Sequence, residues 1–312
     1  MDLTGIQGKF KSYKVVLEPD ENTPEWWAGA PSVVLDKSGT FWLAARMREG
    51  NSPRGRRGYE VRILRSDDGI SFQHAHSIKR EDVPIRGFER PAITIDPKTG
   101  KFKLYACGPF GDDDYHPWCI LKFDDADDPT KFKPETCYAV LKPSKKALEQ
   151  RSNAIAGYKD PFIFIHNGIY HMFTIAYSRM ERSYHYISED GETWKPAENE
   201  LTFDLCGWHN FFTRPASILP LGVGYLLIYE GSHSSWYDPV YNIVTGLAYT
   251  FDLENFIDLT PDAPLLKSTT PGDYITWRYS HWMWINGKIM IYAEVARPNN
   301  SNEIRLFVID NL

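Results

Sequence analysis

The sequence predicts an all-β fold, a five-bladed β-propeller whose last blade is closed by an N-terminal strand, as a single domain over residues 1–312. Three observations lead to this prediction. A strand–turn–strand pattern occurs five times along the chain, a second turn motif follows the pattern, and no segment of twelve or more residues has a persuasive helical periodicity. Five similar units of about four strands are typical of a propeller.

Each repeat has a short polar or Pro-containing start, an apolar strand, a turn that usually contains Gly, and an aromatic-rich strand. The five copies are GAPSVVLDKSGTFWLAAR from Gly29, ERPAITIDPKTGKFKLYAC from Glu89, KDPFIFIHNGIYHMFTIAY from Lys159, TRPASILPLGVGYLLIYEG from Thr213 and RYSHWMWINGKIMIYAEVA from Arg278. Four copies have Pro at the same place. A β-sandwich of this length would not explain the five-fold pattern.

A third strand with a Ser-x-Asp-Gly turn follows two of the repeats, in YEVRILRSDDGISF from Tyr59 and SYHYISEDGETW from Ser183. Asp bonds its own backbone in such turns, and Gly tolerates the positive φ. The fifth repeat ends near Asp310 after three strands, whereas residues 13–17 form a spare strand near the N-terminus. We therefore expect residues 13–17 to close the last blade, because a closed ring leaves no open sheet edge.

Composition excludes several classes of protein. The net charge is −6 and no block of five basic residues occurs, which argues against a nucleic-acid partner. No apolar run is long enough to span a bilayer, and residues 1–14 lack the apolar core of a signal peptide, so we expect no membrane partner and a cytoplasmic protein. The four cysteines form neither a disulfide framework nor a zinc motif. The oligomeric state is left open.

Charged residues occupy most of the positions at which the five innermost strands would begin, and these positions converge on the axis of a propeller. Charges crowded at a buried axis are costly unless they pair or serve a ligand. We expect a funnel site here. The candidate catalytic residues are Glu89, Asp160 and Glu230, and the candidate substrate-binding residues are Trp27, Arg46, Arg90, Lys159, Arg214, His233, Arg278, His281 and Glu294. The alternative is that these charges are structural ion pairs between neighbouring blades.

Paired carboxylates suit the cleavage of glycosidic bonds, because one protonates the leaving oxygen and the other activates water or attacks the sugar. The ten Trp residues provide flat faces for sugar rings, although many would serve as core between blades. His209, His233 and His281 come from separate segments and lack a local metal-ligand spacing. We therefore expect neither a metal nor a cofactor.

These motifs resemble the five-bladed propeller glycoside hydrolases, and most closely glycoside hydrolase family 130, the mannoside phosphorylases and mannosidases. The similar motifs are the first-repeat strand that ends in Arg46, ERP at 89–91, KDP at 159–161 and GYLLIYEG at 224–231. Two positions differ. Arg90 stands where that family has a proton-donating Asp, and Glu230 stands where its phosphorylases have a phosphate-binding His.

The chain is also similar to glycoside hydrolase family 43 in its Asp-Pro blade start and in Glu89, which resembles the acid of that family, but Ala30 occupies the place of an Asp base. The resemblance implies a glycoside hydrolase that acts on a short oligosaccharide or a terminal sugar. Because a carboxylate at position 230 would repel phosphate, hydrolysis is favoured over phosphorolysis. A carbohydrate-binding propeller without catalysis is the alternative, and a metal-dependent lyase or isomerase is a third.

Overall fold

The computed structural model describes residues 6–53, 55–111, 116–144, 155–177, 181–203, 206–237 and 242–310. Within these ranges the chain is built from strands and a few short 3-10 helices, which confirms the all-β prediction. No helix in these ranges is long and apolar enough to cross a membrane.

The strands form units of four, each folded as an antiparallel meander. Unit one is β2 (Trp27–Leu35), β3 (Phe41–Arg48), β4 (Gly58–Ser66) and β5 (Gln73–Lys79), and unit two is β6 (Ala92–Ile95), β7 (Phe102–Pro109), β8 (Trp118–Lys122) and β9 (Tyr138–Leu141). Unit three is β10 (Gly157–His166), β11 (Ile169–Tyr177), β12 (Glu181–Ser188) and β13 (Lys195–Phe203), and unit four is β14 (Phe212–Pro220), β15 (Tyr225–Ser232), β16 (Val244–Thr250) and β17 (Ile257–Asp258).

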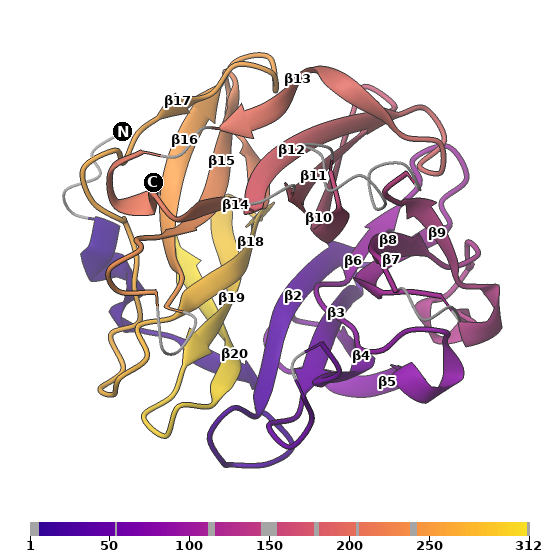
Figure 1. Cartoon of the computed structure of the whole chain (residues 1–312), viewed down its shortest axis with the longest axis horizontal. Coiled ribbons are helices and arrows are strands. Elements are labelled where there is room, and N and C mark those ends of the chain that lie inside the picture. Colours follow the sequence, from indigo (N-terminus) through magenta and orange to yellow (C-terminus); the bar gives the residue numbers. More distant parts are fainter. Residues whose placement is uncertain are drawn as a thin grey trace.

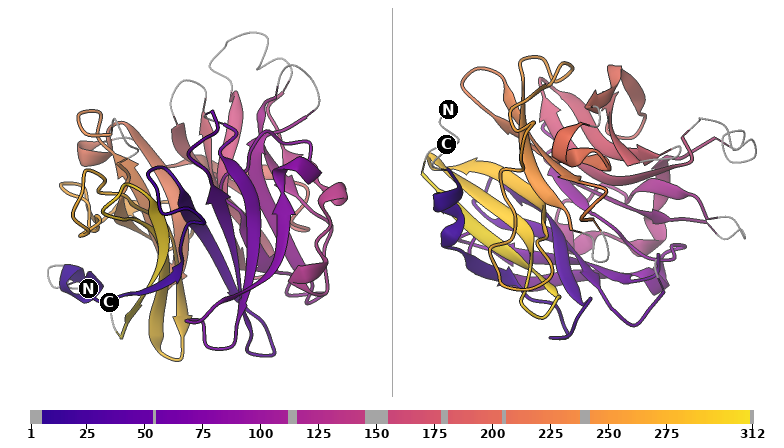
Figure 2. Two further views of the ribbon diagram at one scale, coloured as in Figure 1. Left: turned by 90° about the horizontal axis from the view of Figure 1, so that it is seen from below. Right: turned by 60° about the vertical axis from the view of Figure 1, so that its left-hand side comes forward.

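Unit five contains β18 (Trp277–Ile285), β19 (Lys288–Ala296) and β20 (Asn302–Ile309), with the N-terminal strand β1 (Lys14–Leu17) paired antiparallel to β20. Figure 2 shows this indigo N-terminal segment beside the yellow C-terminal strands. The N-terminal strand therefore pairs with the last strand of unit five, as expected. It is one residue shorter than predicted. One parallel pair, Trp27 with Asn302, links β20 to β2, so units five and one share one sheet.

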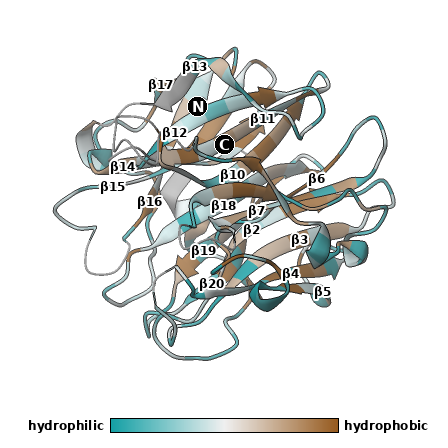
Figure 3. Ribbon diagram, turned by 45° about the vertical axis from the view of Figure 1, so that its right-hand side comes forward, coloured by the Kyte–Doolittle hydropathy of each residue, from teal (hydrophilic) through white to brown (hydrophobic). Residues whose placement is uncertain are grey.

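The units are arranged around a common centre with their first strands innermost (Figure 1). The first strands contact one another in the cyclic order β2, β6, β10, β14, β18 and back to β2. Five large apolar clusters form the core, and each lies between two consecutive units, including units five and one. Figure 3 shows the apolar residues concentrated along the strands and the polar residues in the loops. Burial of apolar surface therefore holds unit to unit as well as strand to strand.

The two Ser-x-Asp-Gly turns make the same hydrogen bonds in their two units. Ser66 and Ser188 each accept a hydrogen bond from the N–H of the Gly three residues later, at 2.9 Å in both turns. The carbonyl oxygen of that Gly accepts from a tyrosine hydroxyl of the preceding unit, over 2.7 Å from Tyr105 to Gly191 and 2.6 Å from Tyr292 to Gly69. The turn motif therefore joins each of these units to its neighbour.

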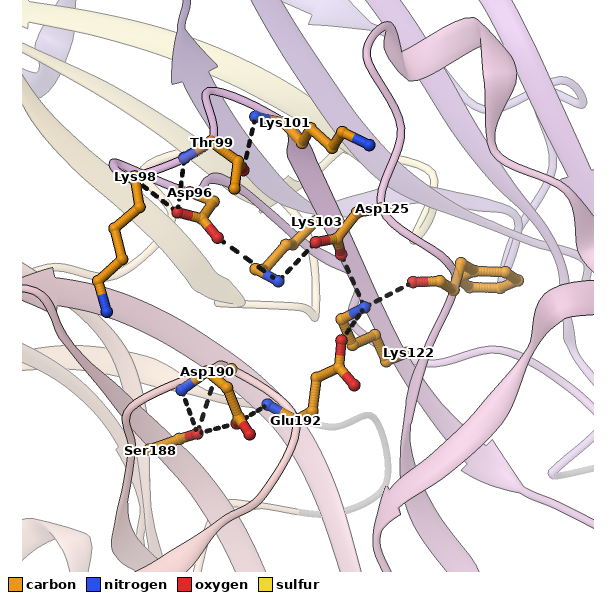
Figure 4. A network of polar contacts seen from close by, with 12 residues as sticks. Asp96, Lys98, Thr99, Lys101, Lys103, Lys122, Asp125, Ser188, Asp190 and Glu192 are labelled. Atoms are coloured by element: carbon orange, nitrogen blue, oxygen red, sulfur yellow. Dashed lines mark hydrogen bonds and ion pairs between the residues drawn. The ribbon is translucent and has the colours of Figure 1, made fainter.

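Two buried lysines strengthen the contact between units two and three (Figure 4). Lys122 Nζ lies 2.7 Å from Asp125 and 3.2 Å from Glu192 of the unit-three turn. Lys103 Nζ shares Asp125, at 2.7 Å. Because both ammonium groups are almost fully buried, these carboxylates compensate for their lost hydration.

Phe10, in the short helix η1 (Ile6–Lys11), anchors the N-terminal segment to unit five. Its ring centroid lies 5.2 Å from that of Trp277 and 5.7 Å from that of Phe307. We expect Phe10→Ala to lower the free energy of unfolding by about 3 kcal/mol, since a large buried ring is lost. Urea unfolding measures this. Val15→Ala, at a half-exposed position on β1, is the control and should change the free energy by less than about 0.5 kcal/mol.

Candidate active site at the centre of the fold

The backbone at the starts of the innermost strands turns their side chains towards the axis. The register of β2, β10 and β18 shifts at equivalent places, and each shift contains a residue with positive φ: Ala30 at 52°, Asp160 at 54° and Tyr279 at 51°. A bulge re-aims the side chain that it carries. Positive φ is unfavourable for Ala and Tyr, so the surrounding contacts must hold this conformation.

A side chain from the preceding unit accepts the N–H of each of these three residues. Glu294 accepts from Ala30 at 3.0 Å, Cys107 Sγ accepts from Asp160 at 3.0 Å, and Glu230 accepts from Tyr279. The three acceptors occupy equivalent places at the ends of second strands. Glu230 and Glu294 therefore each hold the backbone at the start of the next unit's innermost strand.

A cavity of about 210 Å³ lies at these strand starts. Its lining combines two carboxylates, six basic side chains and two aromatic rings. The lining residues are Arg46, Arg48, Gly55, Arg57, Glu89, Trp118, Lys159, Asp160, Arg214, Arg278 and Tyr279. Of the candidates predicted from the sequence, six line this cavity: Arg46, Glu89, Lys159, Asp160, Arg214 and Arg278.

Arg46 holds Glu89 in place. Its guanidinium pairs with Glu89 and, at 3.1 Å, with the fully buried Glu294. Burial alone would raise the pKa of Glu89, but Arg46, Arg48 and Lys159 together hold it below its usual value. Glu89 is therefore ionised at neutral pH, and a quarter of its side-chain surface remains accessible.

Asp160, in unit three, has side-chain hydrogen-bond partners in unit two and in unit five. Its Oδ2 accepts from the Tyr279 hydroxyl at 2.9 Å, and its Oδ1 lies 3.6 Å from Cys107 Sγ, which donates to it. The Tyr279 bond joins the start of unit three to the start of unit five. Tyr279 and Cys107, which lie at repeat-equivalent places of other units, thus hold the Asp160 carboxyl group in the cavity wall.

Glu181, at the start of β12, supports two of the basic groups from behind. It pairs with Lys159 at 2.9 Å and also with Arg214. Burial would raise the pKa of Glu181, but Arg214 and Lys159 lower it to about 2. The negative charge of Glu181 therefore persists at any pH near neutrality and keeps both cations in position.

Arg90 and Glu230 lie behind the cavity wall. Arg90 is fully buried and donates to the carbonyl oxygen of Pro215 at 2.9 Å and to that of Ala216, both on β14. Glu230 is also fully buried, and its Oε2 has no hydrogen-bond partner in the part of the chain that the structure describes. Burial raises the pKa of Glu230 to about 7 against the opposing influence of Arg90, Arg214 and Arg278.

This raised pKa predicts a pH-dependent stability. Because the folded state holds the Glu230 proton more tightly than the unfolded chain, stability present below about pH 4.5 is lost as the pH rises through 7. Glu230→Gln stays neutral and should remove this loss, on the order of 3 kcal/mol. We expect urea unfolding to show the variant gaining stability relative to wild type between pH 5 and pH 8. An equal difference at both pH values would contradict the assignment.

The remaining predicted site residues do not line the cavity. Trp27 is fully buried beneath Arg48, whose guanidinium carbon lies 3.5 Å from the ring centroid. His281 Nδ1 accepts from the N–H of Val33 at 3.3 Å, and burial lowers the pKa of His281 to about 3. His233 lies after β15, hydrogen-bonded to Ser235 at 2.7 Å.

Several lining residues were not among the predicted site residues. Arg48 lies two residues after Arg46 on β3, so the alternation of the strand places both on one face. Tyr279 occupies a strand start that the repeats mark. Trp118 begins a third strand and Arg57 lies in the loop before β4, so neither lies at the start of an innermost strand, where the sequence predicts the site.

One group of side chains in the described ranges has the composition of a metal site, Cys206, His209 and Asp258, with ligand atoms within 4.8 Å of one another. His209 Nε2 lies 3.1 Å from Asp258 Oδ2 and 3.5 Å from Cys206 Sγ. Hydrogen bonds within the group therefore account for the arrangement, and none of the three lines the axial cavity.

A larger cavity of about 370 Å³ lies between η1 and the segment before β18. Apolar residues such as Phe10, Leu265 and Trp277 form most of its wall, and it contains no carboxylate. Glycosidic cleavage requires carboxyl groups, so this apolar cavity is not a candidate active site. The axial cavity is the candidate because it combines two carboxyl groups with six basic side chains where the innermost strands begin.

No protein-family model and no curated protein matches the sequence. Solved structures do match over nearly its whole length. A complex of BT0996 with RGII superposes with a TM-score of 0.73 at 13% identity, covering 98% of this protein and 94% of BT0996. The protein has the fold of the propeller glycoside hydrolases.

Two further structures connect this fold to the families that the sequence resembles. A structure from the glycoside hydrolase family 130 of mannoside phosphorylases, described as containing hydrolases that target β-1,2 mannosidic linkages in Candida mannan, has a TM-score of 0.66 at 16% identity and covers 95% of this protein and 93% of its own length. A thermostable family-43 glycoside hydrolase has a TM-score of 0.66 at 12% identity, with coverage of 93% and 91%. The predicted resemblance to propeller glycoside hydrolases is therefore confirmed at the level of the fold.

Proposed function

We propose that this protein is a glycoside hydrolase, a five-bladed propeller closed by β1, that cleaves a short oligosaccharide or a terminal sugar in the axial cavity. The observation that carries the proposal is the presence of Glu89 and Asp160, from the starts of neighbouring units, in the wall of one cavity. The fold shared with glycoside hydrolases supports it. Most glycoside hydrolases cleave the glycosidic bond with two carboxyl groups, one as the acid and one as the base or nucleophile.

Glu89 is the charged member of the pair in this proposal. Arg46 holds its pKa down, so at neutral pH it is an ionised carboxylate, able to take a proton from water or to attack the anomeric carbon. The accessible part of its side chain faces the cavity that a sugar would occupy. An ionised carboxylate cannot protonate the leaving oxygen, and so the second role falls to another group.

We assign that second role, the protonation of the leaving oxygen, to Asp160. Both of its oxygens accept hydrogen bonds in the structure, so this role requires Asp160 to take up a proton from solvent before the glycosidic bond breaks. Asp160 is the other carboxyl group of the cavity lining, and its bond to Tyr279 fixes the orientation of the carboxyl group. Such pre-orientation lowers the cost of reaching the transition state. Trp118 also lines the cavity. Lys159 Nζ lies over its ring, 4.3 Å from the centroid, so a sugar would contact the part of the ring that Lys159 leaves uncovered.

Glu230 and Arg90 act as positioning residues in this scheme, because neither lines the cavity. Glu230 holds the backbone of Tyr279, and Tyr279 in turn holds Asp160. Arg46, Lys159, Arg214 and Arg278 contact the substrate directly.

Phosphorolysis is the second candidate. The sequence argument against it relied on repulsion between phosphate and Glu230, but Glu230 lies behind the wall, and the wall itself is rich in Arg and Lys. Phosphate would therefore meet cations rather than a carboxylate. Only an experiment with and without phosphate separates the two reactions.

The test is a turnover screen of the purified protein against aryl glycosides and natural oligosaccharides, each with and without inorganic phosphate. We expect release of free sugar at a rate independent of phosphate. Release of a sugar 1-phosphate would assign a phosphorylase instead. Sugar binding measured by calorimetry with no product on any substrate would assign a carbohydrate-binding propeller without catalysis.

A further inference from the structure

The three side chains that hold the strand starts at the axis differ in charge. Glu230 and Glu294 are carboxylic acids, whereas the acceptor in unit two is the thiol of Cys107, whose Sγ lies 3.0 Å from the backbone nitrogen of Asp160. Asp160 is the proton donor of the proposed function. A cysteine therefore replaces the glutamate of units four and five beside the side chain that has to take up a proton.

Cys107 brings no charge to this place. It is fully buried at the end of β7, and burial raises the pKa of its thiol well above the ordinary value, so the thiol keeps its hydrogen at neutral pH. That hydrogen has two acceptors within reach: Asp160 Oδ1, 3.6 Å from Sγ, and the carbonyl oxygen of Arg90, 3.7 Å from Sγ. A thiol is a weak donor, so its hydrogen bond to the Asp160 carboxyl group is weak as well.

The groups around Asp160 act on its protonation in opposite directions. The Tyr279 hydroxyl on β18 donates to Oδ2 at 2.9 Å. Basic side chains from different units interact with its charge, namely Arg46 on β3, Arg90 before β6, Lys159 on β10 and Arg214 on β14. Donors and cations favour the ionised form of a carboxyl group, whereas a nearby carboxylate, such as Glu89 in the same cavity lining, favours the protonated form. The pH at which Asp160 is protonated therefore depends on whether position 107 carries a charge.

We propose that Cys107 is a positioning residue: it holds the backbone of Asp160 as Glu230 and Glu294 hold theirs, and because it is uncharged it sets the pH range in which Asp160 can donate its proton. The inference rests on the proposed function, which gives Asp160 that role. A general acid must be protonated to act, so turnover falls as the pH rises through the point at which the acid loses its proton. A carboxylate at position 107 would move that point to higher pH.

Cys107→Glu and Cys107→Gln are the matched pair that tests the effect of charge. Their side chains have the same size, and a glutamate already accepts the equivalent N–H at the starts of units one and five. We expect the alkaline limb of the pH profile of kcat/KM to lie at least about one pH unit higher in Cys107→Glu than in Cys107→Gln, because two carboxylates a few ångströms apart repel each other. Alkaline limbs at the same pH overturn the inference.

Cys107→Ala and Cys107→Ser test the positioning part. Alanine removes the acceptor from an N–H whose residue has a φ of 54°, so kcat should fall about tenfold while KM changes little. A serine hydroxyl can accept this N–H and is uncharged, so Cys107→Ser should recover most of the lost kcat and keep the alkaline limb of the wild type. An unchanged kcat in Cys107→Ala overturns the inference.

Thermal unfolding shows whether each variant is folded. If the buried glutamate prevents folding, Cys107→Asp with Cys107→Asn as its control supplies the charge in a smaller side chain. Cys137→Ala is the control for the loss of a thiol, because Cys137 packs beside the core between units one and two and does not line the axial cavity. It should leave kcat and the pH profile unchanged.

Titration of the protein without substrate separates this inference from the proposed function. With an NMR-active carbon isotope in the aspartate carboxyl groups, the signal that Asp160→Asn removes identifies Asp160, and its shift with pH follows protonation. A higher midpoint in Cys107→Glu than in Cys107→Gln, without turnover of any glycoside, leaves the effect of Cys107 on Asp160 standing and removes the hydrolase. Turnover that requires Asp160, with equal midpoints in the two variants, keeps the hydrolase and overturns the inference.

Discussion

Glu89→Gln should lower kcat/KM about 10³-fold on any substrate that the protein cleaves, because the amide can neither accept a proton from water nor attack the anomeric carbon. The amide keeps the size of the side chain and can still accept a hydrogen bond from Arg46. Binding of substrate should therefore change far less than turnover. Initial rates with saturating and with dilute substrate give kcat and KM separately. Glu81→Gln, at an exposed position near the unit-one edge, is the control.

Asp160→Asn extends this test to the other carboxyl group. If Asp160 protonates the leaving oxygen, the loss should be large for a poor leaving group such as an alkyl alcohol and small for dinitrophenolate, which leaves without a proton. Equal losses for both leaving groups would remove Asp160 from the acid role. Full activity of Glu89→Gln would remove the carboxylate pair altogether.

Arg90→Ala should lower the free energy of unfolding by about 3–5 kcal/mol, the largest effect on stability that we expect. The substitution removes the side-chain donor from the carbonyl oxygens of Pro215 and Ala216 and leaves Glu230 buried without the cation that lowers its pKa most. Urea unfolding at pH 8, where Glu230 is ionised, measures the loss. Arg65→Ala on the surface should change the free energy by less than about 0.5 kcal/mol.

A double variant sharpens this prediction. Adding Glu230→Gln to Arg90→Ala removes the uncompensated charge, so the effects of the two substitutions should not add and part of the stability should return at pH 8. Strict additivity would mean that Arg90 serves only the carbonyl oxygens of β14.

The sequence predicted the strand organisation well because local chemistry repeats in it. Ser66 and Ser188 each accept the N–H of a Gly with positive φ and so close the turn. In both turns a tyrosine hydroxyl of the preceding unit donates to the carbonyl oxygen of that Gly. The same turn returns in unit four with Leu253 in place of Gly, at a φ of 65°. Packing overrides the local preference at that position, so the Ser-x-Asp-Gly pattern does not mark this turn in the sequence.

The site was partly predictable for the same reason. Charges at repeat-equivalent strand starts indicated an axial site, and Glu89, Lys159 and Asp160 do share one cavity. The sequence could not reveal which charges face the cavity and which lie behind it. That distinction depends on bulges at Ala30 and Tyr279, whose residue types do not favour positive φ.

Glu230 and Glu294 illustrate this difference. Both end a second strand, and the sequence placed both at the funnel, Glu230 with a catalytic role and Glu294 with a binding role. In the fold each one accepts a backbone N–H from the next unit and is fully buried. Arg57 and Trp118 show the converse, because they line the cavity although neither lies at the start of an innermost strand.

The most direct test of the central claim is a crystal structure of Glu89→Gln with the best substrate from the turnover screen. We predict a sugar ring in the axial cavity, with Trp118 along one face and the scissile oxygen within hydrogen-bond reach of Asp160. A sugar bound in the apolar cavity beside Phe10 and Trp277, with the axial cavity empty, would contradict the account.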